Sequence, residues 1–265
     1  MENVYRVVSY PKAGRTWLRV LLCRYFTIHF NIATREKREL LRPYLLCKYN
    51  KSIPIVHFSH FPKKPNGFED ETAWLGKARD MDCSKKQYKN ESIILLSRDP
   101  RDIIVSSYFH KTRRAKRFGR EPIFKGSLND YVFQEKGNID CIIKYYNDWM
   151  QNIFVPKKFC LVRYEDLHKN PKTELKKLLN FLGLFDVDMG ILDSVIEHAS
   201  FANMRLMETQ NCFDSRVLSE RELRDVEAYK VRRGKPGGYL DYLSSEALNY
   251  LNNKLKDLDS RLGIL

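Results

Sequence analysis

A short loop near the start of the chain contains residues that can bind an anion. It runs from Lys12 to Thr16, between an apolar run and a stretch with helical periodicity. A strand, a tight loop and a helix in this order direct backbone N–H groups and a helix N-terminus at one point. Gly14 lets the backbone approach a ligand closely, and Lys12 and Arg15 add positive charge. The loop therefore predicts a phosphate or sulfate site, with an ordinary strand-to-helix turn as the alternative.

The loop differs from the phosphate-binding loop of P-loop kinases. That pattern is GxxxxGK[ST], whereas here the lysine comes first and no Lys-Ser or Lys-Thr pair closes the loop. The apolar strand Ile93–Ser97 is also followed by Arg98, where a P-loop enzyme usually has a metal-binding Asp. Both differences weaken the case for magnesium-dependent nucleotide chemistry, although a small-metabolite kinase using ATP and magnesium stays an alternative.

A second pair of polar residues follows this strand. Arg98 leaves the strand, and Ser106 comes eight residues later in a predicted helix. Asp99 can cap that helix and Pro100 suits its first position. Arg98 is then expected at the carboxyl edge of a sheet, with Ser106 two turns into the helix. Taken alone, Arg98 could be an ordinary surface cation.

Together these segments resemble signatures of sulfotransferases that use 3′-phosphoadenosine 5′-phosphosulfate (PAPS). The family's 5′-phosphosulfate loop is usually YPKSGTTW, and Tyr10–Trp17 reads YPKAGRTW. Arg98 and Ser106 match the Arg and Ser that hold the 3′-phosphate in the family. The covering segment RKGxxGxW matches Arg232–Tyr239, which reads RRGKPGGY. The three signatures lie in the family's order across nearly the whole chain.

The resemblance implies a set of cofactor-binding residues. Arg232, Arg233 and Gly234 would close over the 3′-phosphate, and Tyr164, in a Tyr-Glu-Asp segment, would contact the adenine. The rings of Trp17 and Phe201 would enclose the base, although each aromatic residue taken singly could be a core residue. The full set is Lys12, Ala13, Gly14, Arg15, Thr16, Trp17, Arg98, Ser106, Tyr164, Phe201, Arg232, Arg233 and Gly234.

His60 is the candidate general base, because Ser59–Pro62 reads SHFP and resembles the family's THLP segment. Side chains alternate along a strand, so His57 and His60 should point to opposite faces and only one can enter the site. Lys12 would stabilise the oxygen that leaves the sulfur. A zinc site at the two histidines has no third ligand nearby, and we expect no metal.

The chain departs from the family pattern at several positions. Ala13 replaces a Ser, and Arg15 replaces the first Thr of the loop. Phe58 stands where many relatives have a Lys two residues before the base, which leaves part of the sulfonate stabilisation unexplained. The C-terminal dimerisation motif KxxxTVxxxE is not preserved after Tyr239, so no oligomeric state is predicted.

The elements that must position these residues alternate between strands and helices. Strands are predicted at Tyr5–Tyr10, Ile53–Phe58, Ser92–Ser97 and Lys158–Tyr164, and helices at Arg15–Phe30, Pro100–Lys116, Ile139–Phe154, Pro171–Leu182 and Ser244–Leu258. This pattern favours one α/β domain over residues 1–265, with a mostly parallel sheet flanked by helices and a P-loop-like unit at the N-terminus. The polar segment 207–239 is expected to be a mobile cover over the cofactor.

Composition limits the partners. The net charge is +14, which favours an anionic ligand: nucleic acid, a membrane surface or a polyanionic cofactor. The cluster Lys111–Arg120 holds six cations and no acid; a solvated helix end is the favoured interpretation, and a non-catalytic nucleic-acid or polyanion binder is an alternative function. The proposed cofactor signatures argue against that alternative, so we expect no nucleic-acid partner.

We expect a cytoplasmic protein. No apolar run approaches the length of a membrane span, and the first residues lack the basic and apolar regions of a secretion signal. The six cysteines are scattered without a CxxC pair, as in a reduced protein.

The acceptor is expected to be a small molecule with a hydroxyl or amine. Phenol, alcohol, sugar and amine all stay open. Aromatic residues near the proposed base suggest an apolar pocket, although they could equally be core: Phe58, Phe61, Trp74, Tyr108 and Phe109.

Overall fold

The computed structural model describes residues 4–34, 36–60, 85–114, 123–134, 139–214 and 225–264. At its centre lies a sheet of four parallel strands in the order β2-β1-β3-β4. The strands are β1 (Val4–Ser9), β2 (Ile55–Ser59), β3 (Ser92–Ser97) and β4 (Lys158–Arg163). The predicted α/β class and parallel sheet are confirmed, and each predicted strand lies within two residues of the observed one.

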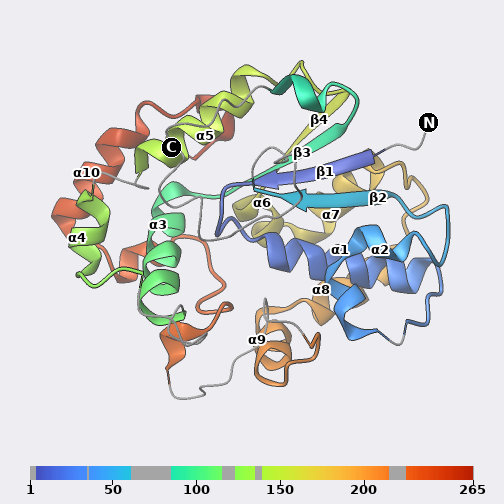
Figure 1. Cartoon of the computed structure of the whole chain (residues 1–265). Helices are drawn as coiled ribbons and strands as arrows, with labels where there is room; N and C mark the ends of the chain where they lie inside the picture. Colours follow the sequence, from blue (N-terminus) through green and yellow to red (C-terminus); the bar gives the residue numbers. More distant parts are fainter. Residues whose placement is uncertain are drawn as a thin grey trace.

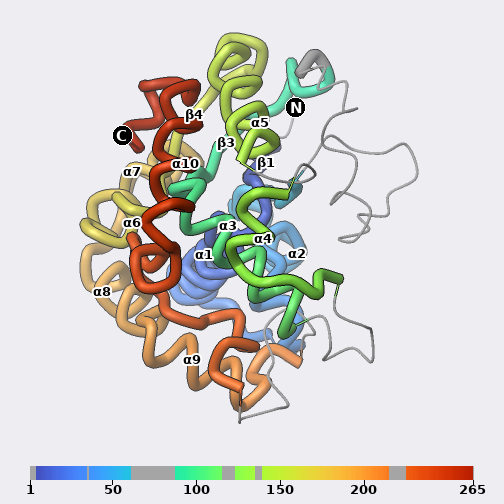
Figure 2. Tube along the Cα trace, turned by 90° about the vertical axis from the view of Figure 1, so that its left-hand side faces the viewer, coloured from blue at the N-terminus to red at the C-terminus, as the bar shows by residue number. Residues whose placement is uncertain are grey.

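Ten α-helices are described around the sheet. They are α1 (Arg15–His29), α2 (Pro43–Leu46), α3 (Pro100–Phe109), α4 (Leu128–Phe133), α5 (Ile139–Gln151), α6 (Tyr164–Lys169), α7 (Pro171–Phe181), α8 (Met189–His198), α9 (Phe201–Thr209) and α10 (Ser245–Leu255). Helices α1, α2, α7 and α8 pack in one group and α3, α4, α5 and α10 in another. Figure 1 shows the sheet between the two groups. Figure 2 shows α10 beside α4 and α5.

The sheet is buried on both faces, which explains its continuous apolar strands. Every residue of β3 is buried, and the side chains of Ile93, Ile94 and Leu95 are fully inaccessible to solvent. Because helices cover both faces of the sheet, the strand has no polar face to alternate with. This burial fixes the positions of the strand ends, and the cavity described below lies at those ends.

Capping residues explain where several helices begin. The side chain of Asp99 accepts the backbone N–H of Arg101, and Pro100 occupies the first turn of α3, as predicted. The α-helical part ends at Phe109, earlier than predicted. The chain then continues as a π-helical turn, η4 (His110–Arg114). The last predicted residues of this helix, 115 and 116, lie outside the described residues.

The predicted covering segment 207–239 is described only in part, because residues 215–224 lie outside the described residues. Its first residues complete α9. From Asp225 onward it contains two short 3₁₀ turns, η6 (Val226–Ala228) and η7 (Gly238–Asp241). Within the described ranges, no helix combines the length and hydropathy needed to cross a bilayer.

A buried ion pair at the sheet predicts a large loss of stability. Arg6 in β1 is 4% exposed, and its guanidinium donates two hydrogen bonds to the Glu91 carboxylate just before β3. Glu91→Ala leaves this charge buried, so we expect the free energy of unfolding to fall by about 3–5 kcal/mol. Chemical denaturation measures it.

The control is Asp148→Ala, which breaks an i,i+4 pair with Lys144 on the surface of α5. Such exposed pairs contribute about 0.5 kcal/mol or less. Equal losses in the two variants would contradict the importance of the buried pair.

Candidate functional site

A cavity of about 440 Å³ opens where the four parallel strands end. Each strand is followed within three residues by a side chain that lines this cavity: Lys12 after β1, His60 after β2, Arg98 after β3 and Tyr164 after β4. Parallel strands place their carboxyl ends at one edge, which is where ligands bind in open α/β sheets. The topology therefore brings together residues that are far apart in the sequence.

The loop after β1 owes its shape to two residues with left-handed backbone conformations. Lys12 has φ +74° and Gly14 has φ +98°, and Gly14 directly precedes α1. A Cβ on Gly14 would lie 2.6 Å from Cδ2 of Tyr164, closer than atoms can pack. Gly14 is therefore needed both for its φ and for the approach of the Tyr164 ring.

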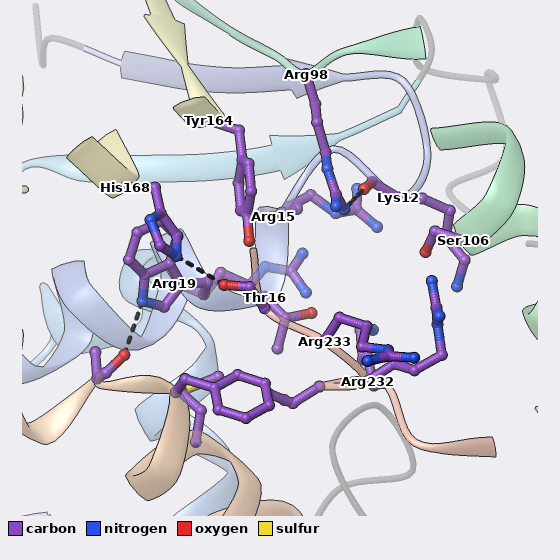
Figure 3. A pocket seen from close by; sticks show the side chains of 18 of the residues that line it. Lys12, Arg15, Thr16, Arg19, Arg98, Ser106, Tyr164, His168, Arg232 and Arg233 are labelled. Carbon is purple, nitrogen blue, oxygen red and sulfur yellow. Dashed lines mark hydrogen bonds between the residues drawn. The ribbon is translucent and has the colours of Figure 1, made fainter. Parts of the chain in front are cut away.

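Three contacts hold the side chain of Arg98 in place beside the loop. Its Nη1 donates to the carbonyl oxygen of Lys12 at 3.1 Å, and its guanidinium lies over the Tyr164 ring, 4.5 Å from the centroid. Asp102, one turn into α3, pairs with Arg98 at 3.5 Å. Ser106 lines the cavity one further turn along the same helix. Figure 3 shows Arg98 and Ser106 on either side of Lys12.

Asp102 also fixes the glycine-rich segment. One carboxylate oxygen accepts the backbone N–H of Gly237 at 2.9 Å, and the other accepts that of Tyr239 at 3.0 Å. The carboxylate is buried, so these charge-assisted hydrogen bonds replace the water it has lost. Asp102 thereby links the Arg98 side of the cavity to the segment that approaches from the other side.

Arg232 lies against two aromatic rings that also contact each other. Its guanidinium carbon lies 4.4 Å from the centroid of Phe109 and 4.7 Å from that of Tyr242, and it pairs with Glu227 at 3.1 Å. The neighbouring Arg233 donates from Nε to the Tyr242 hydroxyl at 2.9 Å. Figure 3 shows both arginines entering the cavity opposite Arg98.

Gly234 completes this wall. It has φ +62°, and a Cβ there would lie 2.0 Å from Cδ2 of Phe201. Its carbonyl oxygen accepts a hydrogen bond from Nε2 of His168 at 2.7 Å. Only glycine allows the Phe201 ring and the backbone to lie this close together.

Aromatic residues line the end of the cavity between α1 and α9. The indole Nε1 of Trp17 donates to the carbonyl oxygen of Ala199 at 2.9 Å, which fixes the ring next to the start of α9. Trp17 also meets Tyr164 edge to face, with centroids 5.5 Å apart. Phe201 begins α9 and is 44% exposed. All three rings line the cavity and offer surfaces to a planar ligand.

His60 is oriented by the main chain of β1. Its Nδ1 lies 2.9 Å from the carbonyl oxygen of Ser9. A carbonyl only accepts, so Nδ1 carries the proton and Nε2 is the nitrogen able to accept one. Burial and the positive charges of Arg15, Arg19 and Lys230 lower the pKa of His60 well below its usual value. The imidazole is therefore neutral at physiological pH.

His57 points elsewhere. Its ring stacks on Tyr44 with centroids 5.2 Å apart, and it is not among the residues that line the cavity. The alternation of side chains along β2 separates the two histidines.

All predicted cofactor residues except Ala13 line the cavity. Ala13 is fully buried in the core, because the backbone reverses direction between Lys12 and Gly14 and turns the side chain inward. Ala13 can therefore contribute only its backbone. Of the aromatic residues expected near the acceptor, Phe61 and Trp74 lie outside the described residues.

The prediction of a solvated basic cluster at Lys111–Arg120 is wrong for two residues. Lys111 is 5% exposed and lies over the Tyr131 ring, and Arg114 is 4% exposed and pairs with the buried Glu208 at 2.8 Å. The π-helical turn directs both into the protein. Residues 115–120 lie outside the described residues.

Among the basic and histidine side chains that line the cavity, sequence reasoning missed four: Arg19, His110, His168 and Lys230. His110 follows Ser106 by four residues, a helical spacing that could have identified it. Its Nδ1 is buried and has no hydrogen-bond partner within the described ranges. The charge of Lys12, together with burial, lowers the pKa of His110.

Comparison with known proteins gives consistent matches. The sequence profile of the family described as "Sulfotransferase domain" matches residues 5–258. Flavonol 3-sulfotransferase of Flaveria bidentis is 24% identical over 97% of this chain and 81% of its own length. Cytosolic sulfotransferase 10 of Arabidopsis thaliana is 25% identical over 93% of this chain and 75% of its own length.

A solved structure has a similar fold. The mouse sulfotransferase SULT7A1, complexed with PAP, superposes with a TM-score of 0.59 and 17% identity, covering 97% of this chain and 85% of that protein. At this level of identity the likeness concerns the fold alone.

The two cavity histidines predict a loss of stability in acid. Both pKa values lie below the ordinary value of about 6.5, so below that pH the unfolded chain binds protons that the folded protein does not. We expect the free energy of unfolding to fall as the pH drops from about 6.5 to 5, by roughly 1 kcal/mol per pH unit for each histidine. Urea denaturation at several pH values measures the slope. His110→Gln should reduce it, and an unchanged slope would contradict the assignment.

Proposed function

The chain belongs to the sulfotransferase domain family, and from this premise we propose that it transfers a sulfuryl group from PAPS to the hydroxyl or amine of a small-molecule acceptor. The observation that carries the proposal is the convergence on one cavity of three segments: the Lys12–Thr16 loop, the pair Arg98 and Ser106, and Arg232–Gly234. The same cavity contains a neutral histidine whose Nε2 can accept a proton.

The charge and shape of the cavity fit PAPS, which carries about four negative charges that need compensation. One lining residue, Glu197, is acidic. Seven are basic: Lys12, Arg15, Arg19, Arg98, Lys230, Arg232 and Arg233. Gly14 and Gly234 leave the backbone open to a ligand where any side chain would collide with an aromatic ring. The buried Nδ1 of His110 can bind a ligand atom.

We assign the cofactor contacts by position. The loop from Lys12 to Thr16 would bind the 5′-phosphosulfate with its N–H groups and with the N-terminus of α1. The 3′-phosphate would be bound by Arg98, Ser106, Arg232, Arg233 and Gly234. The mouse sulfotransferase complexed with PAP supports the choice of cofactor.

The adenine would occupy the aromatic end of the cavity. Trp17, Tyr164 and Phe201 line that end and can stack on a purine. The indole of Trp17 is fixed by Ala199, so the stacking surface is held in place before a ligand arrives.

His60 and Lys12 act at the reacting atoms. Nε2 of His60 takes the proton of the acceptor while the acceptor's oxygen or nitrogen forms its bond to sulfur. PAPS supplies the sulfuryl group, and its S–O bond to the 5′-phosphate breaks with the electron pair leaving on PAP. Lys12 stabilises the negative charge that develops on that leaving oxygen. Side-chain cations and backbone donors serve in this scheme where other transferases use a metal.

We also propose a cytoplasmic location. The likeness to a cytosolic sulfotransferase of Arabidopsis thaliana supports it.

Ligand-induced stabilisation tests the cofactor. PAP without metal should raise the unfolding temperature, because a ligand at 100 times its dissociation constant adds about 2.7 kcal/mol. ADP should have a smaller effect, because it lacks the 3′-phosphate that Arg98 and Ser106 are proposed to bind. Arg98→Ala should lose most of the PAP effect. Stabilisation only by ATP with magnesium would instead indicate a kinase.

Substitution of His60 tests the general base. His60→Gln keeps a hydrogen-bonding side chain but cannot take the proton, so kcat should fall by about 10²–10⁴ while stabilisation by PAP is retained. The matched control is His57→Gln, which changes the other histidine of β2 outside the cavity. Near-normal turnover in His60→Gln would remove this residue from the mechanism.

A further inference from the structure

Arg19 lines the cavity at the side of His60 and has no role in the scheme above. It lies on α1, one turn after Arg15. Its guanidinium carbon is 4.8 Å from the centroid of the Phe58 ring, on β2 two residues before His60. Arg19 thus joins the helix that begins at the anion-binding loop to the strand that carries the candidate base. Figure 3 shows Arg19 among the lining side chains.

The guanidinium of Arg19 contacts the Phe58 ring. A cation over an aromatic ring is attracted to its face, and this contact limits the positions that the guanidinium can take. Paired N–H groups match the oxygen pairs of carboxylate, phosphate and sulfuryl groups. Phe58 itself is apolar and supplies no charge next to His60. Positive charge beside this strand comes from α1, through Arg19.

Arg19 also acts on the candidate base. After burial and the charge of Arg15, its positive charge is one of the causes that lower the pKa of His60. In the proposed transfer step, the sulfur lies between the acceptor atom bound near His60 and the leaving oxygen near Lys12. Arg19 lines the same cavity as these two residues, so its donors face the space in which the group is transferred.

We propose that Arg19 is a further catalytic residue, which donates hydrogen bonds to the oxygens of the sulfuryl group during transfer. The proposal rests on the proposed function. Arg19 would hold the group while its bond to the acceptor forms and its S–O bond to the 5′-phosphate breaks, and the proton still passes to His60. In this assignment Arg19 would contact neither the phosphates nor the adenine.

The comparison of PAP with PAPS isolates this contact, because the two ligands differ by the sulfuryl group. In Arg19→Gln we expect the dissociation constant of PAPS, measured by calorimetry without acceptor, to rise about tenfold while that of PAP is unchanged. In turnover, kcat should fall by about 10²–10³ with little change in the acceptor KM.

Arg24→Gln is the matched control. Arg24 lies on the same helix, α1, but is not among the cavity-lining residues, and its charge acts on His198. We expect this variant to bind PAP and PAPS, and to turn over, like the wild type. If it loses PAPS affinity as Arg19→Gln does, the effect belongs to the helix and the proposal is overturned.

Three other outcomes would overturn the proposal. Equal loss of PAP and PAPS affinity would assign Arg19 to the phosphates or to the fold. A rise confined to the acceptor KM would assign it to acceptor binding. Arg19→Lys keeps a charged donor without the planar pair of N–H groups and should recover only about tenfold of the lost kcat; full recovery of kcat and of PAPS affinity would show that the paired donors are not needed and would overturn their assignment. If the wild type binds neither PAP nor PAPS, the proposed function itself fails.

Discussion

The cavity depends on a single buried carboxylate. Asp102 pairs with Arg98 and accepts backbone hydrogen bonds from Gly237 and Tyr239, so it connects the end of β3, the first turn of α3 and a segment from the C-terminal part of the chain. An isolated buried carboxylate would be costly, and these partners offset the loss of water. Asp102 holds each of these partners in place, and it thereby fixes the positions of two opposite walls of the cavity.

A second buried carboxylate extends this arrangement. Glu208 of α9 is fully buried and accepts hydrogen bonds from the side chain of Arg114 and from the backbone N–H groups of Lys230 and Val231. It therefore anchors the chain just before Arg232. Two carboxylates, on α3 and α9, hold the covering segment at both ends of the stretch that lines the cavity. The stretch from Lys230 to Gly234, which lines the cavity, is consequently held on both sides by main-chain hydrogen bonds.

Local sequence signals predicted the sheet and the strand-end residues well. The apolar run Ile93–Leu96 suits a strand buried on both faces, and Asp99 with Pro100 correctly predicted the start of α3. The short helices α2, α4, α6, α8 and α9 were missed, because so few residues give too few periods to recognise a helical face. Helix α3 is equally short, and it was found from its capping residues.

Charged residues were harder to interpret than apolar ones. The sequence around Lys111 and Arg114 looks like a solvated helix end, yet the π-helical turn directs both side chains inward, Lys111 over Tyr131 and Arg114 to Glu208. Arg19 gave the same ambiguity, because a cation on a helix fits a solvent face as well as a cavity wall. In each case the deciding partner is distant in the sequence: Glu208 for Arg114 and Phe58 for Arg19.

The packing of Phe201 against Gly234 limits which residues the protein can accommodate at these two positions. The aromatic ring occupies the volume that a side chain at position 234 would need. The two positions therefore share one volume, and a larger residue at 234 can be accommodated only when position 201 carries a smaller one. Related chains and designed libraries should show this exchange as paired changes, with the aromatic surface of the cavity moving from α9 to the segment around position 234.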